Sequence, residues 1–415
     1  MNTTDLDWLI VGGGVHGVHL AARLIAEADV DPSRLRIVDP AERLLHCWRM
    51  RTSRTGMRFL RSPSVHHLGI GPWALERFAG KRKVRKRGLF AAPYSRPSLE
   101  LFNAHCDEVV AEFRLHELHV RELATECRPA ADSVLTTLCS GATLTSERIV
   151  LALGVDELTW PDWAPRRSPR VVHIFAPRFE TADSATRFAV VGGGITATQF
   201  ALRLASEGKA VHLISRHAPR QHQFDSDPGW LGPKRMAGFQ CVTDFCERRK
   251  MISSARHRGS VPPDVMKNLR RARSRDELTW HESEVKELCS ARGGISLHLE
   301  DEVEIIVDQV VLATGSPQRR PGGRLVDRMV DDYDLPTGTC GFPIVDRHLR
   351  WHPRVHVAGA LAELELGPTA RNIAGARRAA SRLVSRLALE SSGSCRIRSS
   401  KDVRRSDRAS AMAGS

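Results

Sequence analysis

The sequence predicts an α/β protein in which one strand–turn–helix unit occurs twice. Two glycine-rich turns carry this prediction, at residues 12–17 (Gly-Gly-Gly-Val-His-Gly) and 192–197 (Gly-Gly-Gly-Ile-Thr-Ala). Each follows a short apolar run and precedes an apolar pattern of helical period, which is the context expected of a dinucleotide-binding turn. Each unit later ends in a strand that closes with Leu-Ala-x-Gly, at Gly154 and Gly315. This duplication predicts two Rossmann-like dinucleotide-binding domains, each with a small β-meander.

The glycines of the first turn have separate tasks. Gly12 permits the tight turn, Gly14 lets the backbone approach a pyrophosphate, and Gly17 lets the helix pack close to the strand, with Gly13 in the same loop. The pyrophosphate then meets unpaired N–H groups at the helix N-terminus. Asp39 ends the next strand, 22 residues after Gly17, where an acidic side chain accepts hydrogen bonds from an adenosine ribose. The alternative for Asp39 is an ordinary turn aspartate before a proline.

The other elements follow the same order in both units. In the first unit we expect a helix over 18–28, a strand over 34–39, and strands over 119–123, 134–139 and 148–154. In the second we expect a helix over 197–208, a strand over 210–216, and strands over 284–288, 294–299 and 307–315. A last strand at 355–359 precedes a helix that is expected to begin near Pro368.

Composition and charge exclude several classes of protein. The 415 residues suffice for two or three domains, and no apolar run is long enough to span a membrane. Nine cysteines without regular spacing suit a reducing cytoplasm, and the early first strand leaves no room for a signal peptide. The net charge of +14 is concentrated at 81–88, at 248–275 and in a tail at 391–415 that is expected to be disordered. Without aromatic interleaving or a reader motif these runs do not indicate nucleic-acid binding, and we interpret them as solvated faces.

In the order of its motifs the chain resembles the two-dinucleotide-binding flavoproteins, over residues 7–385. The resemblance implies an FAD-binding domain formed by 1–155 and 315–390, and an inserted NAD(P)H-binding domain at 156–314 with a helical insertion near 220–280. The helix after the last strand is expected to point its N-terminus at the flavin ring. The residues implied for FAD are Gly12, Gly13, Gly14, Gly17, Asp39, Val120 beside the adenine, Gly154 and Gly315 at the crossings between domains, and Gly359.

The second unit differs from the first in ways that bear on its nucleotide. Gly192 and Gly194 keep the turn, but Ala197 replaces the third glycine, and the next strand ends in Arg216 instead of an acidic residue. A carboxylate at this place repels a 2′-phosphate, whereas an arginine pairs with it. We therefore predict NADPH as the second cofactor. The alternative interpretation is that Arg216 is an ordinary surface arginine with no role in nucleotide binding.

Two branches of the family can be compared on their motifs. The disulfide reductases carry a redox-active cysteine pair early in the chain. Here Cys47 is alone, and the pair Cys241 and Cys246 lies after the second turn. The usual Gly-Asp of the last strand is Gly359-Ala360. These departures argue against a disulfide reductase.

The segment 45–113 resembles instead the NADPH-dependent flavin N-hydroxylases, which act on lysine or ornithine side chains. Trp48, the stretch 55–63 and the helix start at 96–102 match their tryptophan, their Gly-Met loop and their Arg-x-Glu-Phe segment. The resemblance implies that NADPH reduces FAD and that a flavin hydroperoxide transfers oxygen from O2 to a small amine. The candidate residues that line the site or donate hydrogen bonds there are Trp48, Arg58, Arg61, His66 and His67.

Three further expectations complete the hypothesis. The loop 224–233 is expected near the active site, with Asp225 and Asp227 as turn residues. The histidines are scattered and no His/Cys cluster shows ligand spacing, so no metal site is predicted. The alternative functions are an FAD-dependent NAD(P)H dehydrogenase or reductase that passes electrons to a quinone or protein acceptor, and a non-catalytic flavoprotein that binds an anionic partner.

Overall fold

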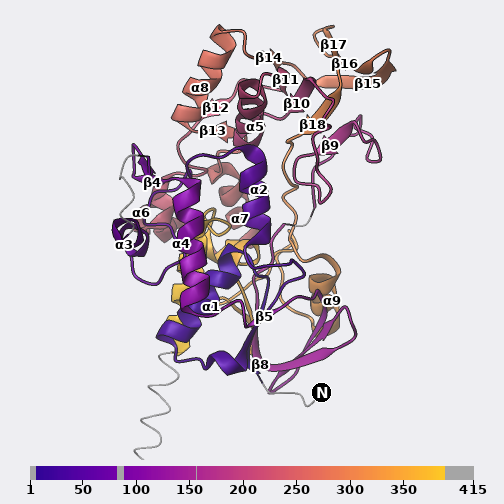
Figure 1. The fold of residues 1–415 in the computed structure, drawn as a ribbon. Coiled ribbons are helices and arrows are strands. Elements are labelled where there is room, and N and C mark those ends of the chain that lie inside the picture. Colours follow the sequence, from indigo (N-terminus) through magenta and orange to yellow (C-terminus); the bar gives the residue numbers. More distant parts are fainter. Residues whose placement is uncertain (1–5, 82–87, 156, 388–415) are drawn as a thin grey trace, which may run out of the picture.

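The computed structural model describes residues 6–81, 88–155 and 157–387, which fold into two α/β units (Figure 1). The tail at 391–415 and most of the basic segment at 81–88 lie outside the described residues. The strands of the first sheet come from residues 6–151 and 350–357, and those of the second from residues 171–312. The second unit is thus inserted between two parts of the first.

The first unit is built on an eight-stranded sheet with the order β19-β20-β8-β1-β2-β5, to which β7 and β6 are added beside β8. The central strand β1 pairs in parallel with β2 and β8, and Leu9 and Ile10 on it are fully buried. Such burial on both faces explains why β1 reads as a nearly continuous apolar run. The strands are β1 Leu6–Val11, β2 Leu35–Val38, β5 His119–Val120, β6 Ala124–Pro129, β7 Val134–Leu138, β8 Thr143–Leu151, β19 Arg350–His352 and β20 Val355–Val357. The helices are α1 Val15–Glu27, α2 His46–Thr55, α3 Ala74–Lys81, α4 Leu99–Glu112 and α9 Gly323–Tyr333, with the short pair β3 Phe90–Ala91 and β4 Arg96–Pro97 before α4.

The second unit repeats this plan with an all-parallel sheet of order β14-β11-β10-β18-β9. Alternate residues of β10 face opposite sides, as a strand requires. Phe188 and Val190 pack into a core with α5 and α8, whereas Ala189 packs into a core with the antiparallel meander β15-β16-β17. The elements are β9 Val171–His173, β10 Arg187–Val191, α5 Ile195–Ser206, β11 Ala210–Ser215, α8 Pro263–Ser274, β14 Thr279–Glu282, β15 Val285–Ala291, β16 Gly294–Leu299, β17 Glu304–Val307 and β18 Gln309–Leu312.

A helical insertion follows β11 and packs against the first unit. It contains η2 Pro228–Leu231, α6 Pro233–Cys241 and α7 Phe245–Ala255, and the short pair β12 Arg220–Gln221 and β13 Ser260–Val261 lies at its edges. Trp230, Phe239 and Ile252 of the insertion form a small core with Phe342 and Leu364 of the first unit. Leu364 belongs to α10 Glu363–Leu366, which follows the short η3 Gly359–Ala362. The insertion therefore joins the two units around the C-terminal segment.

Several predicted boundaries differ from the structure; the strand expected over 119–123, for example, ends at Val120. Two of the differences have a clear physical reason. The strand expected over 307–315 is interrupted at Asp308, where the chain leaves the meander and enters the parallel sheet. The Asp308 carboxylate accepts hydrogen bonds from the backbone N–H groups of Thr186 and Arg187, both 2.9 Å, and these bonds fix the bend. The helix expected near Pro368 begins at residue 373, because residues 368–372 form turns after α10.

Candidate active site

The three motif glycines of the first turn differ in the space around them: Gly12 and Gly17 are tightly packed, and Gly14 is open. Gly12 has φ +114°, and a Cβ on it would lie 2.5 Å from the Ala152 carbonyl oxygen. A Cβ on Gly17 would lie 1.9 Å from the Gly12 carbonyl oxygen. A Cβ on Gly14 would meet no atom of the described residues within 4 Å. Packing thus closes the turn at its first and third glycines and leaves open space at the second, where α1 begins.

Asp39 stands directly beside this turn. One of its carboxylate oxygens accepts the Gly13 N–H at 2.7 Å and the other accepts the Ala41 N–H at 2.9 Å. Its own N–H donates to the Val120 carbonyl at 3.1 Å, so β5 lies against the same corner. Both interpretations of Asp39 fit this geometry, because each carboxylate oxygen keeps a lone pair for a ribose hydroxyl while it holds the turn.

The second glycine turn repeats the first at matching positions. Gly192 has φ +151°, and a Cβ on it would lie 2.5 Å from the Ala313 carbonyl oxygen. Ala197 is fully buried in the place of the third glycine. A Cβ on Gly194 would lie 3.5 Å from Gly259 of the insertion, an ordinary van der Waals distance. Arg216 follows β11 with a 75% exposed side chain, 3.4 Å from Glu284.

Three further glycines lie where the chain passes between the units or beside α1. A Cβ on Gly154 or Gly315 would meet no described atom within 4 Å, and the Gly315 carbonyl accepts the Thr159 N–H at 2.9 Å. Gly359 has φ +65°, and a Cβ on it would lie 3.6 Å from the ring of His16. Burial lowers the pKa of His16 to about 4, so its ring is neutral beside the N-terminus of α1.

Trp48 and Arg58 differ in how firmly they are held. The Trp48 indole N–H donates to Asn103 at 2.9 Å, and its ring packs on Phe102 with the centroids 5.2 Å apart. These contacts fix the indole between α2 and α4. Arg58 has an exposed side chain and joins the fold through its carbonyl, which accepts the Leu99 N–H at 2.9 Å.

Arg61 connects the first unit to the insertion. Its guanidinium donates to the carbonyls of residues 222–224 and to the Ser260 hydroxyl, at 2.7 to 2.8 Å. Burial lowers the pKa of Arg61. The geometry therefore places its donors on the loop that precedes η2.

The neighbouring histidines lie in different environments. His67 is fully buried, its Nε2 lies 3.0 Å from the Pro72 carbonyl, and its ring packs against His105 with the centroids 5.3 Å apart. His66 is half-buried. Burial lowers the pKa of both rings to about 4, with Arg377 acting in the same direction. Both imidazoles are consequently neutral at pH 7.

The loop 224–233 has the turn chemistry that was predicted for Asp227. This carboxylate caps η2 by accepting the Gly229 N–H at 2.7 Å, and it pairs with Arg235 at 3.0 Å. The neighbouring Asp225 is exposed. Its carbonyl accepts the His257 N–H at 2.8 Å, so the loop is fixed to the end of the insertion.

A buried ionic cluster that the sequence does not predict surrounds Glu363. Glu363 is fully buried and accepts hydrogen bonds from Arg249, from Arg256 at 3.0 Å and from Arg371 at 2.7 and 3.1 Å. Burial lowers the pKa of Arg256 to about 9 and that of Arg371 to about 10. The interpretation of 248–275 as a solvated face is wrong for Arg249 and Arg256, whose side chains are 14% exposed. The spacing of these charges gives no signal of the cluster, because Glu363 comes from a distant segment.

The described cysteines form no disulfide. All eight are free, Cys241 and Cys246 included, and Cys246 instead contacts the Thr339 hydroxyl at 2.8 Å. Cys47, on α2, is exposed.

Comparisons with known proteins agree with this geometry. Residues 9–156 match a family model described as FAD-NAD(P)-binding. The ornithine N-hydroxylase of Kutzneria sp. 744 superposes with a TM-score of 0.73 at 17% identity, over 94% of this chain and all of that one. The chain has the fold of the flavin-dependent N-hydroxylases.

Two other solved structures are similar to this chain. The cadaverine monooxygenase of Erwinia amylovora, solved with FAD, gives a TM-score of 0.70 at 16% identity, over 92% of this chain and 94% of that one. The bacillithiol disulfide reductase of Bacillus cereus gives 0.59 at 17% identity, over 93% of this chain and 100% of that one. No curated protein sequence matches the chain. Among the described residues, no helix has the length and apolar character needed to cross a membrane.

Proposed function

We propose that the protein is an FAD-dependent, NADPH-using monooxygenase that hydroxylates the nitrogen of a small amine. The observation that carries this proposal is a fold shared with the ornithine N-hydroxylase over nearly the whole of both chains. In this fold the first glycine turn has open space at Gly14, and the second turn repeats its tight first position at Gly192. FAD, once reduced, supplies the activation of O2 in such an enzyme. The reducing cytoplasm, where NADPH is present, is the proposed compartment.

The open space at Gly14 supports FAD binding. Gly12, Gly13 and Gly17 shape the turn, and the N-terminus of α1 offers unpaired N–H groups to the pyrophosphate. Asp39 is proposed to hold the ribose. The other residues proposed to contact FAD are Val120, Gly154, Gly315 and Gly359.

NADPH is proposed for the second turn, on Gly192, Gly194 and Ala197. Arg216 supports the choice of NADPH over NADH. Among the described residues its exposed guanidinium is held by a single long pair with exposed Glu284, so it can turn to a 2′-phosphate.

The residues around the flavin are proposed to position and shield it. Trp48 is a rigid aromatic surface held by Asn103, and neutral His66 is a candidate to line the site. His67, buried against His105, is proposed as a positioning residue for this segment. Arg58 is proposed to offer its exposed guanidinium as a hydrogen-bond donor at the site.

The reductase alternative receives less support from this chain. The reductase structure superposes less well than the hydroxylase structures. Cys47 is a single cysteine, and Ala360 stands after Gly359.

The test is oxygen and NADPH consumption by the FAD-loaded protein with a panel of diamines and basic amino acids. We expect one amine class to accelerate NADPH oxidation and to yield its hydroxylamine in proportion to the oxygen consumed. NADPH oxidation that no amine accelerates, but that a quinone or disulfide does, would overturn the proposal in favour of a reductase.

A further inference from the structure

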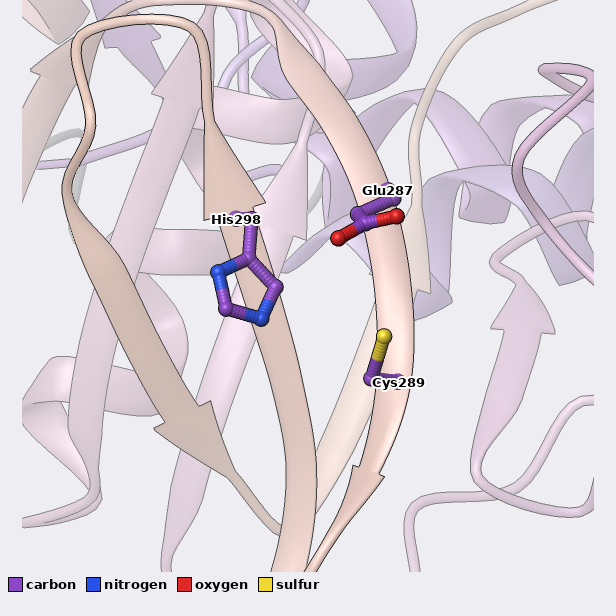
Figure 2. A group of neighbouring side chains, drawn as sticks. All are labelled: Glu287, Cys289 and His298. Carbon is purple, nitrogen blue, oxygen red and sulfur yellow. The ribbon is translucent and has the colours of Figure 1, made fainter.

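Three metal-ligating side chains meet on the outer face of the second meander. Glu287 and Cys289 lie on β15 and His298 lies on β16 (Figure 2). A carboxylate oxygen, the thiol sulfur and an imidazole nitrogen all lie within 4.8 Å of one another. We propose that these three residues form a binding site for a divalent transition-metal ion, with Zn²⁺ as the ion that suits them. None of the three is among the residues proposed to hold FAD or NADPH.

The register of the β15–β16 hairpin places these residues together. Glu287 is directly opposite His298, and Cys289 is opposite Ser296 in the next pair on the same face. The intervening Leu297 points inward and is fully buried in the core beneath the meander. Because two hydrogen-bonded strands already fix the three Cα positions, a metal ion has to order side chains only, and the entropic cost of binding is small.

The three side chains are available for coordination. Among the described residues, the Glu287 carboxylate and the Cys289 thiol make no hydrogen bond or ion pair, and both residues are exposed. The His298 ring has one long contact, 3.4 Å from the Ser296 hydroxyl to Nε2. A metal therefore replaces no strong interaction, and little desolvation opposes its binding.

The kinds of ligand select the kind of metal. Thiolate, imidazole and carboxylate together suit Zn²⁺, whereas Mg²⁺ and Ca²⁺ prefer oxygen ligands alone. Three protein ligands leave the fourth tetrahedral position to water. Glu304 adds a second carboxylate, since it is opposite His298 on β17 and accepts a hydrogen bond from Ser296 at 2.6 Å. The negative charge on both sides of the imidazole favours a cation.

Zinc titration of the FAD-loaded protein, after treatment with a chelator and its removal, tests the site. Isothermal calorimetry and competition with a chromogenic chelator should give one high-affinity Zn²⁺ per chain. Cys289→Ser and His298→Ala should each weaken binding at least about tenfold, the scale on which even indirect partners of a metal act. The matched control is Cys139→Ser, which removes another exposed cysteine that lies near a glutamate, Glu122, and should bind Zn²⁺ like the parent.

A spectroscopic readout identifies the thiolate ligand directly. Co²⁺ in place of Zn²⁺ should give a sulfur-to-metal charge-transfer band that Cys289→Ser removes and Cys139→Ser keeps. The flavin content of each variant reports whether it has folded. Absence of stoichiometric binding, or equal binding by the parent and Cys289→Ser, would overturn the proposal whether or not the protein is a monooxygenase.

Discussion

At the scale of single residues, a substitution at Gly14 tests FAD binding without disturbing the fold. Its backbone, at φ −79°, suits any residue, and an added Cβ meets no described atom within 4 Å. Gly14→Val should therefore fold normally and lose FAD, because its branched side chain fills the space proposed for the pyrophosphate. Flavin absorbance of the purified variant and its far-UV circular dichroism measure the two effects. Gly17→Val is the contrasting variant, expected to destabilise the fold itself, since a Cβ there collides with the Gly12 carbonyl. Full flavin retention by Gly14→Val would contradict the assignment.

Arg216 makes a prediction about nucleotide choice at the same scale. Its pair with Glu284 is exposed and 3.4 Å long, so its loss should cost less than about 1 kcal/mol of stability. Arg216→Glu should raise the KM for NADPH much more than the KM for NADH, because the new carboxylate repels a 2′-phosphate. Glu284→Gln is the control and should change the ratio of the two KM values little. An unchanged ratio in Arg216→Glu would assign this arginine to the ordinary surface.

At the scale of elements, local patterns predict those features that local contacts determine. The turns at Gly12 and Gly192 and the parallel strands before them follow from apolar runs and glycine spacing, which the structure confirms. The bend at Asp308 was not predictable in this way, because its hydrogen-bond donors lie on Thr186 and Arg187, more than 100 residues away. The same reason applies to Glu363, whose partner Arg256 is also more than 100 residues away. Glu287 and His298 are close in sequence, but their pairing depends on the register of the hairpin, which the strand pattern alone does not specify.

The short helix α10 is held by the Glu363 cluster, and this predicts a large stability effect. Glu363→Gln leaves Arg249, Arg256 and Arg371 without their carboxylate, and such a loss in a buried network costs about 3–5 kcal/mol. Urea denaturation should show this loss, and adding Arg256→Met should restore part of it. Glu147→Gln is the control, because this carboxylate is 41% exposed and its loss should cost less than about 1 kcal/mol. Equal effects of the two glutamine variants would show that the cluster contributes no more than a surface pair.

At the scale of the whole molecule, arginines hold the two units in a fixed relation. Arg54 of α2 donates to the carbonyls of Ile174 and Ala176 at 3.1 and 2.7 Å, and Arg203 of α5 donates back to the Arg54 carbonyl at 3.0 Å. Arg61 adds the contact with the insertion. These bonds run from one glycine-turn unit to the other, so they fix the spacing between the two proposed nucleotide sites, as electron transfer from NADPH to FAD requires.

The buried histidines predict how the whole fold responds to acid. Burial lowers the pKa of His356 to about 3 and that of His105 to about 3, whereas an unfolded histidine titrates near 6.5. Between these values the unfolded chain binds more protons than the folded one, so stability is full above about pH 6.5 and falls as the pH drops toward 3. Each such histidine contributes a slope of up to about 1.4 kcal/mol per pH unit. Urea denaturation between pH 7.5 and 4.5 should show this decline.

His356→Phe isolates the contribution of one ring to that decline. In the parent the ring centroids of His356 and Trp8 are 5.4 Å apart, and phenylalanine keeps a ring in this place. The substitution also removes the His356 Nδ1, which has no hydrogen-bond partner among the described residues. As the pH falls, the free energy of unfolding should therefore decrease less steeply in the variant, by up to about 1.4 kcal/mol per pH unit. Below pH 6 the variant should be more stable than the parent. His116→Asn, at a ring with 63% exposure, should keep the slope of the parent. If His356→Phe keeps the parent slope as well, then the acid sensitivity of the fold arises from other groups, because an imidazole that is neutral when folded and charged when unfolded cannot be removed without changing the proton balance.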